Sequence, residues 1–130
     1  RVSGPLLDRI DLHLELAPVS PADLVRREQR SGEEGADTRR AAQCVQQARM
    51  RQLERQGCLN ARLGPDQTLR HCLPDEAGLR LLEQAVRAQG LSARSQHRVL
   101  RLARTVADIG GIARPGVEQV AEALALRRPV

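Results

Sequence analysis

The sequence contains no lysine and no aromatic side chain, although it is 130 residues long. Without Phe, Tyr or Trp, the chain cannot build the stacking platform on which many proteins bind single-stranded nucleic acid. The core must come from 19 leucines together with Ala, Val and a few Ile. Because these small aliphatic side chains occur without long β-branched runs, they favour helix over sheet.

The absence of lysine makes arginine the carrier of all 21 basic charges, against 16 acidic residues and a formal net charge of +5. An excess of arginine suggests a phosphate-bearing partner, either a nucleotide or a nucleic acid, because the planar guanidinium matches phosphate oxygens. Replacement of Lys by Arg is also expected from a GC-rich genome. The positions of the arginines therefore carry more weight than their number.

Long apolar runs and a secretory signal are both absent, so we expect no membrane span and a cytoplasmic location. Cys44, Cys58 and Cys72 are odd in number and no CxxC or HxxxH pair accompanies them, so we expect reduced thiols and assign no metal ligand. The chain begins at Arg1 rather than Met, and we expect a processed product or a piece of a longer protein.

The first 36 residues differ in pattern from the rest. Ile10, Leu12, Leu14 and Leu16 alternate with polar residues, which predicts a half-buried strand over residues 10–16. No other segment reads as a strand, so its partners are expected outside this sequence. Residues 17–36 are rich in Pro, Gly and charge and predict a flexible linker with one short helical turn near residues 22–27.

The remainder predicts an all-α bundle of four or five helices over about residues 37–126. The first expected helix spans residues 37–56 and carries a thin apolar stripe of Ala41, Cys44, Val45 and Ala48. The later helices are expected to span residues 65–72, to run from Pro74–Glu76 to Gly90, to run from the Ser92 cap to Ile109, and to begin at Pro115.

The helix expected over residues 92–109 has an apolar side and an opposite side of arginines. Five arginines and no acid lie between Gln84 and Ala107, whereas a solvated helix face normally mixes both signs. A phosphate-bearing partner and a solvated surface with counter-ions explain this face equally well. The candidate phosphate or DNA contacts are Arg98, Arg101 and Arg104; a neighbouring subunit and water are the alternatives.

Several segments resemble one family in order and spacing. The segment Ser3-Gly-Pro-Leu-Leu-Asp-Arg-Ile-Asp-Leu12 resembles the arginine-finger segment of magnesium-chelatase-like AAA+ ATPases, and residues 90–109 resemble their C-terminal lid. Residues 52–57, 59–63 and 120–124 resemble the ComM/YifB branch. The resemblance implies a lid domain over residues 37–130, preceded by the end of the AAA+ core over residues 1–36.

By this resemblance, Arg9 is the arginine finger that acts on the nucleotide of a neighbouring subunit. Arg94 is the sensor-2 arginine and is expected to touch the nucleotide of its own subunit. Asp8 and Asp11 are expected to hold the Arg9 loop. Members of the family form rings, so the expected parent is a homo-oligomeric, hexameric ATPase that uses ATP and Mg and acts on DNA, as the ComM branch does in branch migration.

The Walker A and Walker B motifs of that family are missing from this chain, which has no lysine for a phosphate loop. The chain alone is therefore expected to hydrolyse no ATP, and an N-terminal AAA+ core is an expected partner. Two other interpretations stay open: a motor subunit of a magnesium-chelatase-type protein remodeller, and a stand-alone basic helical module that binds DNA.

Overall fold

The chain folds into helices throughout its regular structure, which confirms the predicted all-α class. The structure is a computed structural model that describes residues 3–127, and for residues 31–36 it describes only the backbone. Within this range no strand is present. The elements are α1 (Gly4–Leu7), α2 (Pro21–Gln29), α3 (Ser31–Gln56), the 3₁₀ turn η1 (Asn60–Arg62), α4 (Pro65–Cys72), α5 (Glu76–Gln89), α6 (Ala93–Ile109) and α7 (Val117–Leu126).

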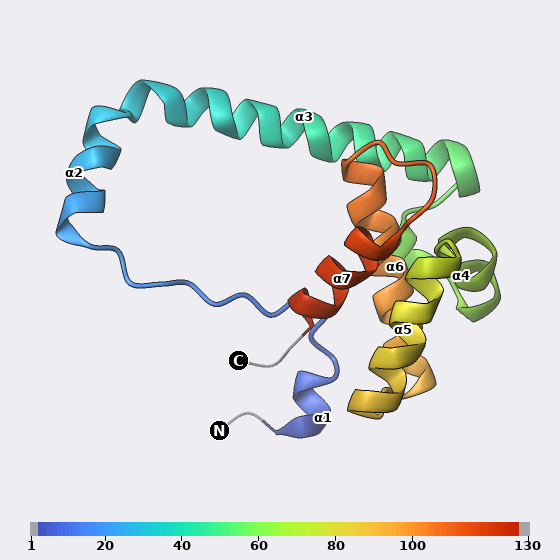
Figure 1. Ribbon diagram of the computed structural model, residues 1–130. Helices are drawn as coiled ribbons and strands as arrows, with labels where there is room; N and C mark the ends of the chain where they lie inside the picture. Colours follow the sequence, from blue (N-terminus) through green and yellow to red (C-terminus); the bar gives the residue numbers. More distant parts are fainter. Residues whose placement is uncertain (1–2, 128–130) are drawn as a thin grey trace.

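Helix α6 is the centre of a bundle formed by α3 to α7, in agreement with the predicted four or five helices (Figure 1). It packs against α3, α4 and α7, and α5 packs against α7. Aliphatic side chains from these helices form a single core, which comprises Leu63, Cys72, Leu82, Val99, Leu100, Ala103, Val120 and Ala123. The absence of aromatics thus leaves a small core in which alanines allow the helices to approach closely.

The predicted helix boundaries of the bundle are largely confirmed because the capping residues act as expected. The Ser92 side chain accepts a hydrogen bond from the backbone N–H of Ser95, and the Asp75 side chain accepts one from Gly78. Helices α3 and α5 end at Gly57 and Gly90, whose positive φ angles of 75° and 63° suit glycine. The last helix begins at Val117, two residues after the predicted Pro115.

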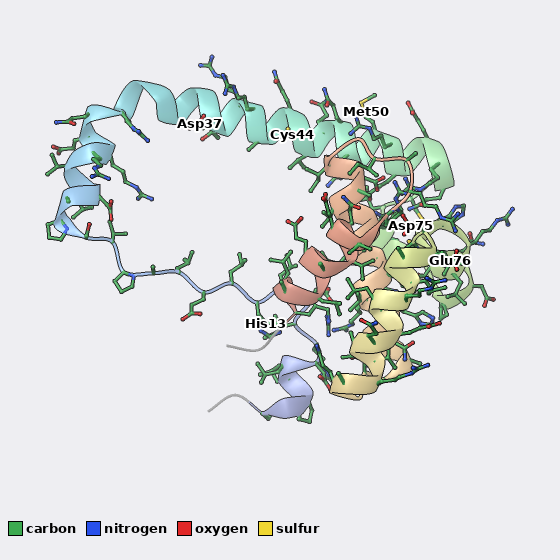
Figure 2. The ribbon with its side chains drawn as sticks, viewed as in Figure 1. His13, Asp37, Cys44, Met50, Asp75 and Glu76 are labelled. Atoms are coloured by element: carbon green, nitrogen blue, oxygen red, sulfur yellow. The ribbon has the colours of Figure 1, made fainter. Side chains whose placement is uncertain are left out.

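The strand predicted over residues 10–16 is not present. Residues 12–20 have no regular secondary structure and run as an extended segment away from the bundle (Figure 1). A strand needs a neighbour for its backbone groups. In this segment the His13 N–H donates to the Leu126 carbonyl at 2.6 Å and the Ile10 N–H donates locally to the Leu7 carbonyl at 3.1 Å. His13 accordingly lies beside α7 (Figure 2). The apolar alternation is present in the sequence, but residues 3–127 contain no strand with which this segment could pair.

The predicted flexible linker over residues 17–36 is helical from Pro21 onward. Ser20 caps α2 and Pro21 occupies its first position, so the helical turn predicted near residues 22–27 extends to Gln29. Helix α3 then begins at Ser31, six residues earlier than predicted, and its N-terminal half extends beyond the bundle (Figure 1). The glycines at 32 and 35 do not stop it.

The predicted apolar stripe of α3 is only partly buried. Ala48 is buried, but Ala41, Cys44 and Val45 are exposed. The second buried residue of α3 is Gln52, which is polar. Helix α3 is therefore held to the bundle mainly by a polar network near its C-terminal end, which a search for apolar periodicity cannot find.

Candidate functional site

Arg9 and Arg94 line the same pocket, although they lie 85 positions apart in the sequence. The pocket has a volume of about 210 Å³, and its other lining residues are Pro5, Asp8, Ser92 and Ser95. Arg9 lies in the turn after α1, where its backbone N–H donates to the Leu6 carbonyl at 3.0 Å. Arg94 lies in the first turn of α6, just after the Ser92 cap. The structure thus brings together the two residues that the family resemblance singles out.

The pocket favours an anion. Two guanidinium groups and two serine hydroxyls face a single carboxylate, that of Asp8. Helix α6 begins at this pocket and is 17 residues long, so the positive end of its dipole adds to the field. Among the side chains that the structure describes, neither arginine forms an ion pair. Both guanidiniums are therefore free to bind phosphate oxygens.

Arg98 fixes the Arg9 loop from the side of α6. Its Nη1 donates to the backbone carbonyl of Asp8 and lies 3.3 Å from the Asp11 carboxylate. The Arg98 side chain is only 13% exposed, so both contacts are made in a partly desolvated place. The Asp11 carboxylate therefore helps to hold this loop, as predicted, whereas Asp8 takes part through its backbone carbonyl and not through its side chain. Arg98 itself, a candidate phosphate or DNA contact, points into the chain.

Arg127 approaches the same carboxylate from the end of α7, with its Nη1 3.8 Å from Asp11. Burial lowers the pKa of Arg127, and the charge of Arg98 lowers it further, while Asp11 and Asp8 oppose this effect. Asp11 therefore separates two arginines that would otherwise repel each other. We call Arg98, Arg127 and Asp11 the loop clamp.

The other two candidate contacts on α6 also turn toward the protein. The Arg101 Nη1 is 3.4 Å from the Leu63 carbonyl and 3.5 Å from the Thr68 hydroxyl, both at the limit of hydrogen bonding. Arg104 is 5% exposed and donates to the carbonyls of Ile112 and Ala113. The placement of Arg104 on an exposed basic face is thus wrong, because its donors are used inside the fold.

Asp108 is the shared partner of Arg104 and of residues from the motifs at 52–57 and 59–63. This carboxylate is 1% exposed and receives a bidentate pair from Arg55, at 2.8 and 3.0 Å. Arg104 donates to it at 3.0 Å, and so does the Asn60 side chain. The Asn60 backbone N–H donates to the Gln52 side chain at 2.8 Å. One buried charge network therefore joins α3, η1 and α6.

The balance of charges keeps Asp108 ionised. Burial alone would raise its pKa, but hydrogen bonds from Arg55 and Asn60 and the charge of Arg104 outweigh this effect, so the pKa lies below its usual value. Sequence reasoning recognised Gln52, Arg55 and Asn60 only as family motif residues. The sequence did contain one signal. Asp108 is the first acidic residue after the arginine-rich stretch that ends at Ala107, and it could have been recognised as a partner of Arg104 inside the fold.

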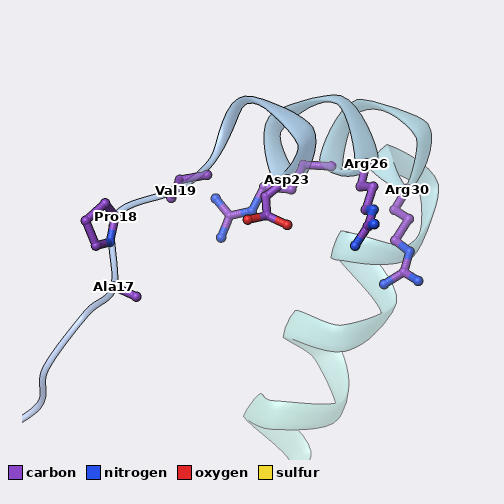
Figure 3. Close-up of a pocket in the computed structure, with 7 residues that line it drawn as sticks. Ala17, Pro18, Val19, Asp23, Arg26 and Arg30 are labelled. Carbon is purple, nitrogen blue, oxygen red and sulfur yellow. The ribbon is translucent and has the colours of Figure 1, made fainter.

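A second basic pocket lies at α2, in the segment predicted to be a linker. It measures about 410 Å³ and is lined by Ala17, Pro18, Val19, Asp23, Arg26, Arg27 and Arg30 (Figure 3). Sequence reasoning missed it because the segment was interpreted as flexible. The signal was present, since positions 26, 27 and 30 fall on one side of a helix.

No metal site is evident in the described part of the chain, where no three His, Cys, Asp or Glu side chains gather. The cysteines lie apart, with Cys44 exposed and Cys72 buried. Burial raises the pKa of the Cys72 thiol to about 11. No helix among residues 3–127 combines the length and apolar character that crossing a membrane requires.

Comparison with known proteins decides the family. The family model for the C-terminal part of magnesium chelatase subunit ChlI matches residues 35–127. The chain belongs to this family. Within it, the competence protein ComM of Haemophilus influenzae is 36% identical over 130 residues, which cover 100% of this chain and 25% of ComM. YifB of Salmonella typhimurium is 39% identical over 109 residues, which cover 84% of this chain and 21% of YifB.

These matches confirm the resemblance to the ComM/YifB branch and identify the chain as a magnesium-chelatase-like C-terminal part. The chain spans about a quarter of the length of these relatives. The match to the family model begins within α3, whereas the match to ComM also includes the segment that carries Arg9.

Proposed function

We propose that this chain is the lid and arginine-finger segment of a ring-forming AAA+ ATPase that acts on DNA. In this proposal Arg9 and Arg94 together contact the phosphates of one nucleotide, which the neighbouring subunit binds. The observation that carries it is the single pocket lined by both arginines. Side chains that share one pocket of one chain serve one ligand more readily than two ligands in different subunits.

This arrangement revises the expected role of Arg94. A sensor-2 arginine acting on its own subunit's nucleotide would have to leave the pocket that it shares with Arg9. With both arginines presented by one subunit, the site is complete only at a subunit boundary. Hydrolysis then depends on ring assembly, which is the expected behaviour of a homo-oligomeric motor.

The residues present suit a triphosphate. Phosphoryl transfer spreads negative charge over the transferred group, and two unpaired guanidiniums at one site can stabilise that charge. The Ser92 hydroxyl donates to Ser95 Oγ, which leaves the Ser95 hydroxyl hydrogen as a further donor at the pocket wall. ATP and Mg supply the reacting phosphoryl group and its charge neutralisation. The chain's own role is to position Arg9 and Arg94.

The similarity to ComM favours DNA as the substrate of the ring. The family description favours the second candidate, a chelatase-type motor whose partner is a protein. ATP turnover of the whole protein with and without DNA separates them, because a DNA-acting ring is expected to be stimulated.

The test of the arginine roles is to measure ATP affinity and ATP turnover in the assembled whole protein carrying Arg9→Ala or Arg94→Ala. We expect turnover to fall by about 10³-fold or more for Arg9→Ala, while ATP affinity changes little, because nucleotide is held mainly by the phosphate loop of the other subunit. Full turnover of Arg9→Ala in assembled rings would refute the proposal.

A further inference from the structure

The basic pocket at α2 shares no lining residue with the Arg9 pocket. It lies where the extended segment of residues 12–20 meets α2. This segment, α2 and the N-terminal half of α3 project away from the bundle, and we call them the arm (Figure 1). We propose that this pocket binds the sugar–phosphate backbone of DNA. The proposal rests on the proposed function in one respect, that the whole protein acts on DNA.

Three arginines line this pocket, Arg26 and Arg27 from the last turn of α2 and Arg30 from its C-cap. At about 100° per residue, positions 26, 27 and 30 fall within an arc of roughly 100°. Figure 3 shows the side chains of Arg26 and Arg30 side by side, extending in the same direction from the helical ribbon. All three arginines are exposed, and none has an ion pair among the side chains that the structure describes.

The one carboxylate in the pocket already has a partner. The Ser20 hydroxyl donates to Asp23 Oδ2 at 2.6 Å and accepts a hydrogen bond from the Asp23 backbone N–H at 3.2 Å. Asp23 thus belongs to the cap of α2 and pairs with none of the arginines. The lining retains an excess of positive charge, three guanidiniums against one carboxylate.

The opposite wall of the pocket is apolar and comes from Ala17, Pro18 and Val19. A phosphodiester strand offers both chemistries, because anionic phosphates alternate with sugars that have apolar faces. Aromatic side chains, which would stack on bases, are absent from the whole sequence. The contact is therefore to the backbone and independent of sequence.

This assignment also accounts for the arginines of α6. The sequence indicated a phosphate-bearing partner for Arg98, Arg101 and Arg104, but these side chains are engaged inside the fold. The exposed arginine cluster with one shared hollow is instead on α2. Because the arm projects from the bundle, a DNA strand can contact Arg26, Arg27 and Arg30 without contacting the helices of the bundle.

The test measures binding of the nucleotide-free whole protein to a short mixed-sequence DNA duplex between about 50 and 200 mM salt. The variant carries Arg26→Gln, Arg27→Gln and Arg30→Gln together. Each lost phosphate contact reduces the slope of log K against log salt by about 0.9, so we expect a reduction of about 2.7. The matched control carries Arg62→Gln, Arg70→Gln and Arg87→Gln, which remove the same charge from exposed positions elsewhere. Its slope should change by less than about one.

An unchanged slope in the α2 variant, or an equal reduction in the control, would overturn the proposal. A third variant with Lys at positions 26, 27 and 30 keeps the charge and guards against a folding defect. Because counter-ion release depends on charge, its slope should stay near that of the unmodified protein, and a loss as large as that of the Gln variant would also overturn the proposal. Basal ATP turnover is expected to be unchanged in all three, so failure here is distinguishable from failure of the Arg9 and Arg94 assignment.

Discussion

The Arg98 guanidinium lies 3.3 Å from the Asp11 carboxylate and so ties helix α6 to the loop that carries Arg9. Ninety residues of sequence separate Arg98 from Asp8, whose carbonyl it also binds. The lid helix thereby determines where Arg9 stands. A change in the lid can move Arg9 without any change in Arg9 itself.

This coupling predicts that Arg98→Gln lowers ATP turnover of the assembled whole protein, on the order of 10- to 100-fold, with ATP affinity little changed. The physical reason is that loss of the Arg98 contacts lets the loop shift, and a small shift moves the Arg9 guanidinium out of its productive position. Asp11→Asn should have a smaller effect, and the double variant should lose less than the two single effects combined, because both substitutions break the contact between Arg98 and Asp11. Asp66→Asn, which alters an exposed acid of α4, is the control. Additive losses for Arg98→Gln and Asp11→Asn would contradict the clamp.

The buried charge network predicts a large stability loss for Asp108→Asn. The substitution leaves Arg55 and Arg104 without their counter-charge, and breaking a buried pair in this way typically costs about 3–5 kcal/mol. Denaturant unfolding of the chain measures the difference in free energy of unfolding. Glu83→Gln, at an exposed position of α5, should change it by less than about 0.5 kcal/mol. Equal stability of the two variants would contradict the structural role of Asp108.

The same network predicts how stability depends on acid. The pKa of Asp108 is lower in the folded chain than its usual value, so the folded state binds this proton less readily than the unfolded state. Its contribution to stability is present above the unfolded pKa of about 3.9 and is lost as pH falls through the folded pKa. The free energy of unfolding should therefore fall more steeply below about pH 4 in the unmodified chain than in Asp108→Asn. Parallel acid limbs would contradict this.

Thiol chemistry should distinguish the cysteines. Cys44 is exposed, whereas Cys72 is buried and its pKa is raised to about 11, so at neutral pH the Cys72 thiolate is scarce and out of reach. An alkylating reagent should modify Cys44 quickly and Cys72 only on unfolding, as mass spectrometry of the digested chain can show. Because the folded state keeps the Cys72 proton to a higher pH than the unfolded state, the free energy of unfolding should also decline as pH rises from about 9 to 11. Rapid alkylation of Cys72 in the folded chain would contradict its burial.

The bundle could be predicted from the sequence because local signals determine its helices. Ser92, Gly57 and Gly90 act through caps and turn conformations that need only near neighbours. The strand over residues 10–16 could not be judged in this way, since a strand is stabilised by a partner and the alternation of apolar residues says nothing about whether one is present. The extent of α3 was missed because the glycines at 32 and 35 suggested a break.

The candidate site was predicted in its residues but not in its geometry. Arg9 and Arg94 came from motif resemblance, and only the fold shows that they line one pocket. Arg104 was misplaced because helical periodicity gives a direction around the axis and cannot reveal the loop after α6, whose carbonyls receive its guanidinium. The α2 pocket needed a helix that the composition of the segment did not suggest.

The central claim, that one subunit presents both Arg9 and Arg94 to its neighbour's nucleotide, is tested most directly by mixed rings. Arg94→Ala subunits of the whole protein are mixed with subunits whose phosphate-loop lysine is replaced, and ATP turnover is measured at matched total protein with co-assembly confirmed. We predict recovery of turnover, because an intact phosphate loop in one subunit then faces an intact Arg9 and Arg94 in the next. If Arg94 served its own subunit's nucleotide, no site in such a ring would be complete, and the absence of recovery would contradict the account.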